Sequence, residues 1–383
     1  MPLLVAFSAL AQDGGRKIYQ SGSRWVEEIS GTLAAAKHLL VKTASGSVTV
    51  HGDGSEKLSY VVRRQVRASS KKTAEKIFSA MHFSASSQGG SAILIAEGDS
   101  DVTVSAPNDL DLVQTKTQSG DIEVTDIAGR VEAVSAGGHL HLDNIGGSIS
   151  GTTGCQDVNV GKIGGDIFLR TGGGNVSIDS AGHNLIARSR GGDVRVLASR
   201  GDVDIETGGG NIIVKQSFGN LRGSTSGGSI SIGDIGGGVS VETGGGSIYL
   251  ASGNGLVDAE TNSGTIQCYR VSHGLTAATG AGGITAEFVG GRGQFADSHL
   301  LTSHGDVVVY LPSDLGVDVR AKIVMGNANN IVSEFPGLRV TSTMSADYRA
   351  RQIFAEGLLN GGGPILNIEA TTGNIELRRL KPR

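Results

Sequence analysis

Residues 208–250 read GGGNIIVKQSFGNLRGSTSGGSISIGDIGGGVSVETGGGSIYL and decide the fold. Within this stretch a phrase of glycine, a small polar residue and alternating apolar residues returns every 18 residues, at Ile212, Ile230 and Ile248. The first apolar residue of this phrase recurs along most of the chain, at Ile122, Leu140, Val158, Val176, Val194, Ile212, Ile230, Ile248, Ile266 and Ile284. A second series lies nine residues later in each repeat, at Val131, Ile149, Ile167, Leu185, Val203, Leu221, Val239, Val257 and Leu275. A fixed period of this kind is typical of a repeat protein.

Each series has a second column two positions later, and residues two apart share one face of a strand. The partners of the first series are Val124, Leu142, Val160, Ile178, Val196, Val214, Ile232, Leu250, Cys268 and Ala286. Those of the second series are smaller: Ala133, Gly151, Leu169, Ala187, Ile205, Gly223, Val241, Ala259 and Ala277. Two inward faces of unequal bulk can interdigitate across a thin core. The pattern predicts an all-β fold, a single-stranded parallel β-helix or β-solenoid, whose 18-residue coils consist of two half-repeats of about nine residues.

The hand of the coil follows from two arguments. Parallel crossover connections are right-handed in most proteins. Left-handed hexapeptide helices need an aliphatic residue every six positions, and the column that would supply it reads Val134, Thr152, Arg170, Arg188 and Glu206. We therefore predict a right-handed coil.

One column of the repeat is hydroxylated throughout. It comprises Ser135, Thr153, Thr171, Ser189, Thr207, Thr225, Thr243, Thr261 and Thr279. The spacing predicts a hydroxyl ladder at a corner of the coil, in which each hydroxyl satisfies the next. Glycines follow directly, as at Gly244, Gly245 and Gly246, because glycine permits tight corners.

Composition supports thin strands between glycine turns: 61 of the 383 residues are Gly, and only 4% are aromatic. The net charge of −4 provides no overall attraction to nucleic acid. We interpret two basic clusters as solvated faces or tails: Arg63, Arg64, Arg67, Lys71, Lys72 and Lys76, and Arg378, Arg379, Lys381 and Arg383. Two cysteines are too few for a disulfide scaffold, and the repeat places Cys155 at an exposed turn and Cys268 in the core.

The ends differ from the middle. Residues 1–11 contain a short apolar run, Leu3–Leu10, and a small-residue pattern typical of a cleaved export signal. We expect a flexible segment over 12–30, strands and a capping helix over 31–115, regular repeats over 116–311, and C-terminal strands with a cap over 312–383. Residues 69–83 place Ala74, Ile77, Phe78 and Met81 at helical spacing. No apolar stretch is long enough to span a membrane.

Four phrases carry a resemblance to a known family: TQSGDIEVTDIAGRVEAVSAGG at 117–138, SAPNDLDL at 105–112, YLPSDLGV at 310–317 and GGGPILNIEATTGNIELR at 361–378. In these the chain resembles the bacterial putative-adhesin family of unknown function, also called toastrack, over roughly residues 30–380. The resemblance implies an exported or envelope-facing β-solenoid, with adhesion or envelope sensing as its presumed role. It supplies no catalytic residue.

Calcium and other metals need clustered acidic or imidazole ligands. The position before each first-series strand is Asp121, His139, Asp157, Asn175, Asp193, Asn211, Ser229, Ser247 or Thr265, and six of these nine cannot carry negative charge. We interpret them as turn residues that bind local backbone. His139 and His141, with Asp121, Asp157, Glu123 and Asn159 on neighbouring coils, could share a metal, but a solvated ladder is the interpretation we favour. We predict no metal and no cofactor.

An enzyme would need clustered acids and bases on one face. The best candidates are Asp202, Asp204 and Glu206, with Arg188, Arg190 and Arg195 one coil away. Because any solvated sheet carries such charges and the repeats have no long insertions to build a pocket, we predict no catalytic residues.

The function we infer from the sequence is a non-catalytic scaffold of the cell envelope or surface, outside the cytoplasm. It would bind an envelope polysaccharide or a surface protein, and could form oligomers through the solenoid ends. Two alternatives stay open: a carbohydrate-active β-helix lyase or hydrolase, and an extracytoplasmic sensing module of an envelope-stress system.

Overall fold

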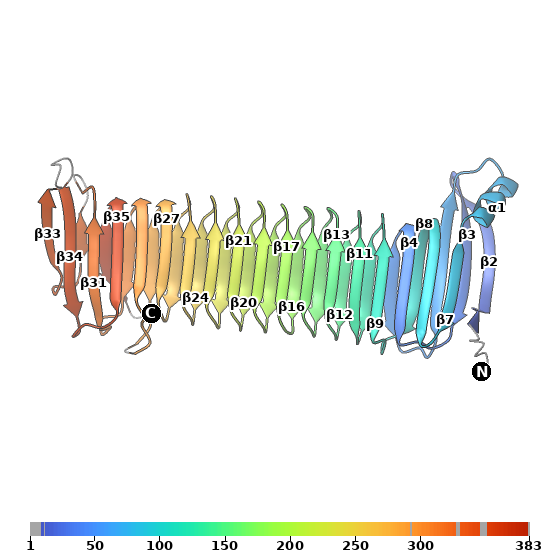
Figure 1. Ribbon diagram of the computed structural model, residues 1–383, viewed down its shortest axis with the longest axis horizontal. Helices are drawn as coiled ribbons and strands as arrows, with labels where there is room; N and C mark the ends of the chain where they lie inside the picture. Colours follow the sequence, from blue (N-terminus) through green and yellow to red (C-terminus); the bar gives the residue numbers. More distant parts are fainter. Residues whose placement is uncertain (1–8, 11, 292, 327–329, 345–350, 382–383) are drawn as a thin grey trace, which may run out of the picture. The chain divides into compact units, whose positions relative to one another are not determined.

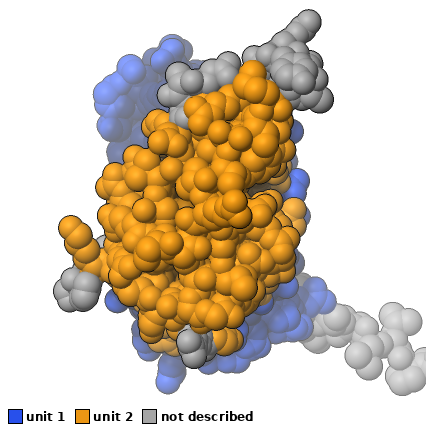
Figure 2. Space-filling model, turned by 90° about the vertical axis from the view of Figure 1, so that its left-hand side faces the viewer, with its two compact units in different colours: residues 1–190 blue, residues 191–383 orange. Residues whose placement is uncertain are grey.

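A computed structural model describes residues 9–10, 12–291, 293–326, 330–344 and 351–381. These residues form strands with one short helix, and the chain divides into two compact units, residues 1–190 and 191–383 (Figure 2). The boundary falls inside the predicted repeat region, and the 18-residue register holds in the repeats of each unit. The prediction of an all-β solenoid is confirmed, while its right hand stays a prediction.

In the first unit the repeats form two parallel sheets, one from each apolar series (Figure 1). Ile122 pairs with Leu140 in the first-series sheet, and Val131 pairs with Ile149 in the second-series sheet, so each strand is in register with the strand 18 residues later. The first-series strands are β10 (Ile122–Ile127), β12 (Leu140–Ile145), β14 (Val158–Ile163) and β16 (Val176–Ala181). The second-series strands are β11 (Arg130–Ser135), β13 (Ile149–Thr153), β15 (Ile167–Thr171) and β17 (Leu185–Ser189).

The second unit repeats this arrangement. Its first-series strands are β18 (Val194–Ser199), β20 (Ile212–Ser217), β22 (Ile230–Ile235), β24 (Ile248–Gly253), β26 (Ile266–Val271), β28 (Ile284–Phe288) and β30 (Val307–Leu311). Its second-series strands are β19 (Val203–Thr207), β21 (Leu221–Thr225), β23 (Val239–Thr243), β25 (Val257–Thr261), β27 (Leu275–Ala281) and β29 (Ser298–His304). The register again advances by 18, as from Val194 to Ile212.

Both predicted apolar columns are buried, and they face each other. A Cβ atom placed on Gly151 would lie 3.3 Å from Leu140 Cδ1, which belongs to the opposite sheet. The small residues of the second series therefore make room for the larger ones of the first. A further buried column at one corner was not predicted, although it has the same period; it includes Ile127, Ile145, Ile163, Ala181, Ser199, Ser217, Ile235, Gly253 and Val271.

The hydroxylated column is buried at a corner, as expected, but its bonding was predicted wrongly. Thr225 Oγ1 donates to the carbonyl oxygen of Gly210 in the preceding coil at 2.8 Å, and accepts a bond from the amide of Gly228 at 3.2 Å. The other hydroxyls of the column make the same bond to the carbonyl 15 residues earlier. Each buried backbone carbonyl at a glycine turn needs a hydrogen-bond donor. The hydroxyl supplies that donor, so the column joins successive coils through the backbone.

The N-terminal part of the first unit contains antiparallel strands. The predicted flexible segment over 12–30 is wrong, because β2 (Gln12–Ser21) and β3 (Arg24–Leu33) form a hairpin, which pairs with β6 (Leu58–Val66). The neighbouring strands are β4 (His38–Ser45), β5 (Val48–Asp53), β7 (Phe83–Gln88), β8 (Ser91–Pro107) and β9 (Leu112–Thr117). Most of the predicted export signal lies outside the described residues; within it, β1 (Ala9–Leu10) pairs with β7.

The predicted helix is present as α1 (Lys71–Ala80). Ser70 is its N-cap and accepts a bond from the amide of Thr73. Ala74 and Phe78 are buried, and the helix packs against β2, β3 and β6 (Figure 1). Because α1 covers the strands at one end of the unit, it closes a core that would otherwise be open.

The interpretation of the first basic cluster as wholly solvated is wrong at Arg64. Its side chain is buried in β6, directly opposite the buried Glu27 of β3. Arg64 Nε donates to Glu27 Oε2 at 2.7 Å, and Arg64 Nη1 donates to the carbonyl of Met81 at 2.8 Å. Arg16 binds the other carboxylate oxygen. Alternation along β6 aims Arg64 inward, and Glu27 neutralises its charge there.

The closing phrase of the chain adds one more coil to the second unit. It forms β35 (Ile365–Thr372) and β36 (Ile375–Arg379), which pair in parallel with β29 and β30. In the sequence between β30 and β35 lie four further strands: β31 (Val317–Ile323), β32 (Ile331–Ser333), β33 (Arg339–Met344) and β34 (Arg351–Leu359). β34 runs antiparallel to β31, and β33 pairs with β34.

Candidate binding groove

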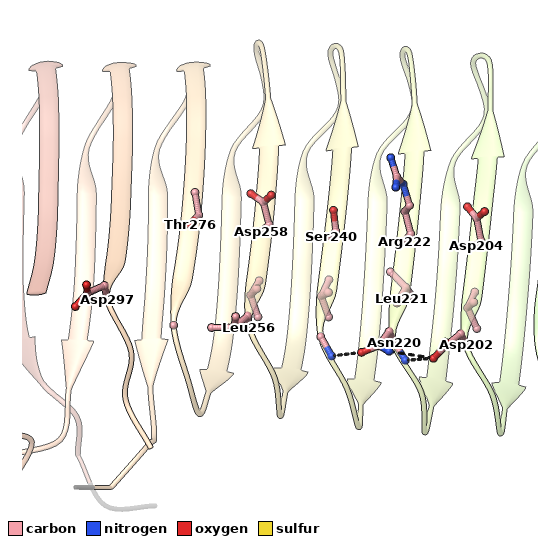
Figure 3. A pocket seen from close by; sticks show the side chains of 15 residues that line it. Asp202, Asp204, Asn220, Leu221, Arg222, Ser240, Leu256, Asp258, Thr276 and Asp297 are labelled. Carbon is pink, nitrogen blue, oxygen red and sulfur yellow. Dashed lines mark hydrogen bonds between the residues drawn. The ribbon is translucent and has the colours of Figure 1, made fainter. Parts of the chain in front are cut away.

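An open groove of about 630 Å³ lies on the outer face of the second-series sheet in the second unit (Figure 3). Its outward-pointing side chains form two rows that run across the strands, and between these rows lie the buried residues Val203, Leu221, Val239 and Val257. The upper row is Asp204, Arg222, Ser240, Asp258 and Thr276, with one residue from each successive strand. The lower row is Asp202, Asn220, Gly238, Leu256, Gly274 and Asp297. The groove is therefore a product of the repeat.

The upper row follows from the alternation of the strands. Each of its members stands between two buried positions, such as Leu221 and Gly223 on either side of Arg222, so its side chain points outward. Parallel register then sets neighbouring members about 4.8 Å apart. Arg222, the single cation of the row, lies between Asp204 and Ser240, and Asp258 and Thr276 follow on the next two strands. The row offers donors and acceptors in a line along the sheet.

The lower row contains a short amide ladder. Asp202 Oδ1 accepts bonds from the backbone amide of Asn220 at 2.8 Å and from its Nδ2 at 3.2 Å. Asn220 Oδ1 in turn accepts from the amide of Gly238 at 2.9 Å. Gly238 and Gly274 carry no side chain, and between them Leu256 is 64% exposed. The lower edge of the groove thus combines bound polar groups with one exposed apolar side chain.

Two residues of the predicted acid–base cluster belong to the groove. Asp202 and Asp204 line the groove, whereas Glu206 does not. Arg195 lies on β18, in the first-series sheet. Arg188 and Arg190 belong to the other unit. Arg222, Ser240 and Asp258 were missed, although their 18-residue spacing from Asp204 could have identified them.

In the candidate metal ladder of the first unit, the two Asp side chains accept hydrogen bonds from the backbone of the next coil. Asp121 Oδ1 accepts from the amide of His139, and Asp157 Oδ1 accepts from the amide of Asn175, both at 2.8 Å. His141 lies in register with Glu123 and Asn159. Among the residues that the structure describes, no group of three or more His, Cys, Asp or Glu side chains is placed to hold a metal ion.

The column before the first-series strands was expected to bind local backbone, and this detail is wrong. Asp193 accepts from the amide of Asn211, and Asn211 accepts from the amide of Ser229, one coil further on. Ser229 and Ser247 continue the pattern through their hydroxyls. Accepting a hydrogen bond from a backbone amide requires an oxygen but no charge. This explains why Asp, Asn and Ser all occur in the column.

The two cysteines lie as predicted: Cys155 is exposed, Cys268 is buried, and neither is in a disulfide. Burial raises the pKa of the Cys268 thiol to about 12. Because the thiolate is the reactive form, we expect one alkylation adduct on the native chain at pH 8 and two adducts in urea, counted by mass spectrometry. Cys155→Ser should abolish the native adduct; loss of that adduct in Cys268→Ser instead would contradict the assignment.

Comparison with known proteins gives little further information. No family model matches the chain, and no curated protein matches it. One solved structure, of a putative cell adhesion protein from Clostridium sporogenes, aligns over 97% of this chain and 100% of its own, at 9% identity and a TM-score of 0.14. Within the described residues no helix is long and apolar enough to cross a membrane.

Proposed function

We propose that the protein is a non-catalytic binding scaffold of the cell envelope or surface, whose groove takes an extended partner. The observation that carries this proposal is the upper row of the groove, in which each of five neighbouring strands presents one side chain. Four strand steps make the row roughly 19 Å long. A polymer that lies along the sheet can meet a polar group at every coil.

The partner we propose is an envelope polysaccharide or a surface protein. The row contains two carboxylates, one guanidinium and two hydroxyls. This mixture of acceptors and donors suits a partner with hydroxyl and amide groups better than a partner with a single strong charge. The N-terminal apolar run supports a location outside the cytoplasm, in the periplasm, at the surface or secreted. The groove is open, a shape that favours holding a long chain over enclosing a small substrate.

The test is a binding screen of the purified full-length chain against a glycan array and against envelope extracts, with mass spectrometry of every bound partner. We expect binding without new products. New cleavage products would contradict the non-catalytic part of the proposal and favour the enzyme alternative.

Arg222→Glu should weaken binding to the partner found in this screen about 10-fold, because it removes the cation of the row and sets a second carboxylate beside Asp204. The matched control is Arg195→Glu, which makes the same change at an exposed site on the other sheet of the unit. Equal affinities of the two variants, measured by biolayer interferometry, would exclude the groove as the binding site.

A further inference from the structure

Three of the six tyrosines gather on the outer face of the first-series sheet in the second unit. Tyr249 stands on β24, Tyr269 on β26 and Tyr310 on β30. The rings of Tyr249 and Tyr269 lie 5.7 Å apart between centroids, at an angle of 50°. Tyr249 is 43% exposed although it is one of the largest side chains of the sheet. A tyrosine ring exposed to this degree on a flat sheet is available to a ligand.

Two hollows lie beside Arg270, and Tyr249 and Tyr269 line one of them. One, of about 400 Å³, is lined by Tyr249, Ala251, Tyr269 and Arg270, and the small Ala251 side chain leaves space beside the two rings. The second, of about 460 Å³, is lined by Arg270, Glu287, Val289, Pro312, Ser313, Asp314, Leu380 and Lys381. Arg270 lines both hollows, so a ligand longer than one hollow would pass its guanidinium.

Arg270 is held in a fixed orientation. Its Nη2 donates to Asp234 Oδ1 at 2.7 Å, and its Nε donates to the carbonyl of Ala251 at 3.2 Å. Its backbone has a φ of 48°, a left-handed conformation that a non-glycine residue adopts at a cost. A guanidinium carries five N–H groups. Among the described residues only these two atoms of the Arg270 side chain have a hydrogen-bond partner, so Nη1 is free for a ligand.

The Tyr269 side chain is half-buried. Burial raises the pKa of its phenol, and the neighbouring Tyr249, Tyr310 and Glu287 raise it further. A tyrosine hydroxyl is protonated at neutral pH with or without this shift, and it can donate a hydrogen bond.

We propose that this face binds a polysaccharide of β-linked pyranose units, which would run across β24 to β30. A pyranose presents C–H groups on one face, which suit the negative face of a tyrosine ring, and hydroxyls on its edge, which suit the planar donors of Arg270. Tyr249 and Tyr310 are three strand steps apart, roughly 14 Å, a length of about three sugar units. The guanidinium disfavours a cationic ligand at the same place.

This proposal rests on the proposed function for its ligand class, a polysaccharide, and adds a second contact on the opposite sheet from the groove. The test is isothermal titration of the full chain with the β-1,4-linked hexasaccharides of glucose, mannose and N-acetylglucosamine. At least one is expected to bind. Tyr249→Ala and Arg270→Asn, which keeps a residue tolerant of positive φ, should each weaken that binding at least 10-fold, and Tyr269→Phe should retain most of it.

The matched control is Phe218→Ala, because Phe218 is an aromatic residue of the same unit that is 64% exposed and lies outside both hollows. Binding of none of the three hexasaccharides, or equal losses in Tyr249→Ala and Phe218→Ala, would overturn the tyrosine site. Envelope binding that survives Tyr249→Ala but fails in Arg222→Glu would overturn it while the proposed function stands. Absence of any envelope partner would refute the proposed function itself.

Discussion

Glu27→Ala is expected to destabilise the N-terminal strands of the first unit by about 3–5 kcal/mol. The Arg64 side chain is only 4% exposed, and Glu27 is its carboxylate partner. Without that partner a positive charge stays buried beside the ring of Phe78, 5.8 Å from the ring centroid, with the Met81 carbonyl as its acceptor. The protein must then either keep an uncompensated charge in the core or open the end of the unit.

Trp25 is the single tryptophan of the chain and lies on β3 beside the pair, so its fluorescence reports this end during urea unfolding. Hydrogen exchange of β3 and β6 gives the local free energy of opening. The control is the double variant Glu27→Leu with Arg64→Met, which removes both charges and should restore most of the stability. A Glu27→Ala midpoint equal to that of the parent chain would show that the ion pair does not support this end.

Gly246→Ala is expected to destabilise the second unit by roughly 3 kcal/mol, because there is no room for a methyl group. A Cβ atom on Gly246 would lie 1.9 Å from the carbonyl oxygen of Gly228 and 2.4 Å from its carbon. Both atoms belong to the backbone of the previous coil, which the stacking of the strands holds in place. The coils must therefore separate locally to admit the side chain.

Gly245→Ala is the matched control, one residue away in the same turn. There the nearest atom to a Cβ is the carbonyl oxygen of Gly227, at 3.9 Å, so the change should cost no more than about 0.5 kcal/mol. Urea unfolding followed by circular dichroism compares the two variants directly. Similar midpoints for both would show that the close approach of the coils at Gly246 does not limit stability.

The repeat itself could be predicted because one period fixes both the buried column and the corner of each coil. Ile212, Ile230 and Ile248 lie in one buried column since a step of 18 residues returns the chain to the same place in the coil. Thr225 marks the corner for the same reason. The hairpin of β2 and β3 could not be predicted in this way, because antiparallel end strands occur once and repeat nothing.

The groove was predicted only in part. Asp202 and Asp204 could be predicted because they are acids close together in the sequence. Arg222, Ser240 and Asp258 also line the groove, but one or more whole coils separate them from Asp204. Their proximity depends on parallel register, which sequence spacing allows but does not prove. The tyrosine site was missed because Tyr249 and Tyr269 do not fall in the same column; Tyr269 stands two positions further along its strand.

By itself the sequence determined the coil length, the two inward columns, the glycine corners and the places of both cysteines, because each of these recurs with a local pattern of burial or turn chemistry. Only the tertiary structure decided what joins the coils and what their surfaces present. Hydroxyls bond to carbonyls of the preceding coil, Arg64 enters the core opposite Glu27, and Tyr249 meets Tyr269. These contacts depend on side-chain direction and on which strands become neighbours, and both are set when the coils stack.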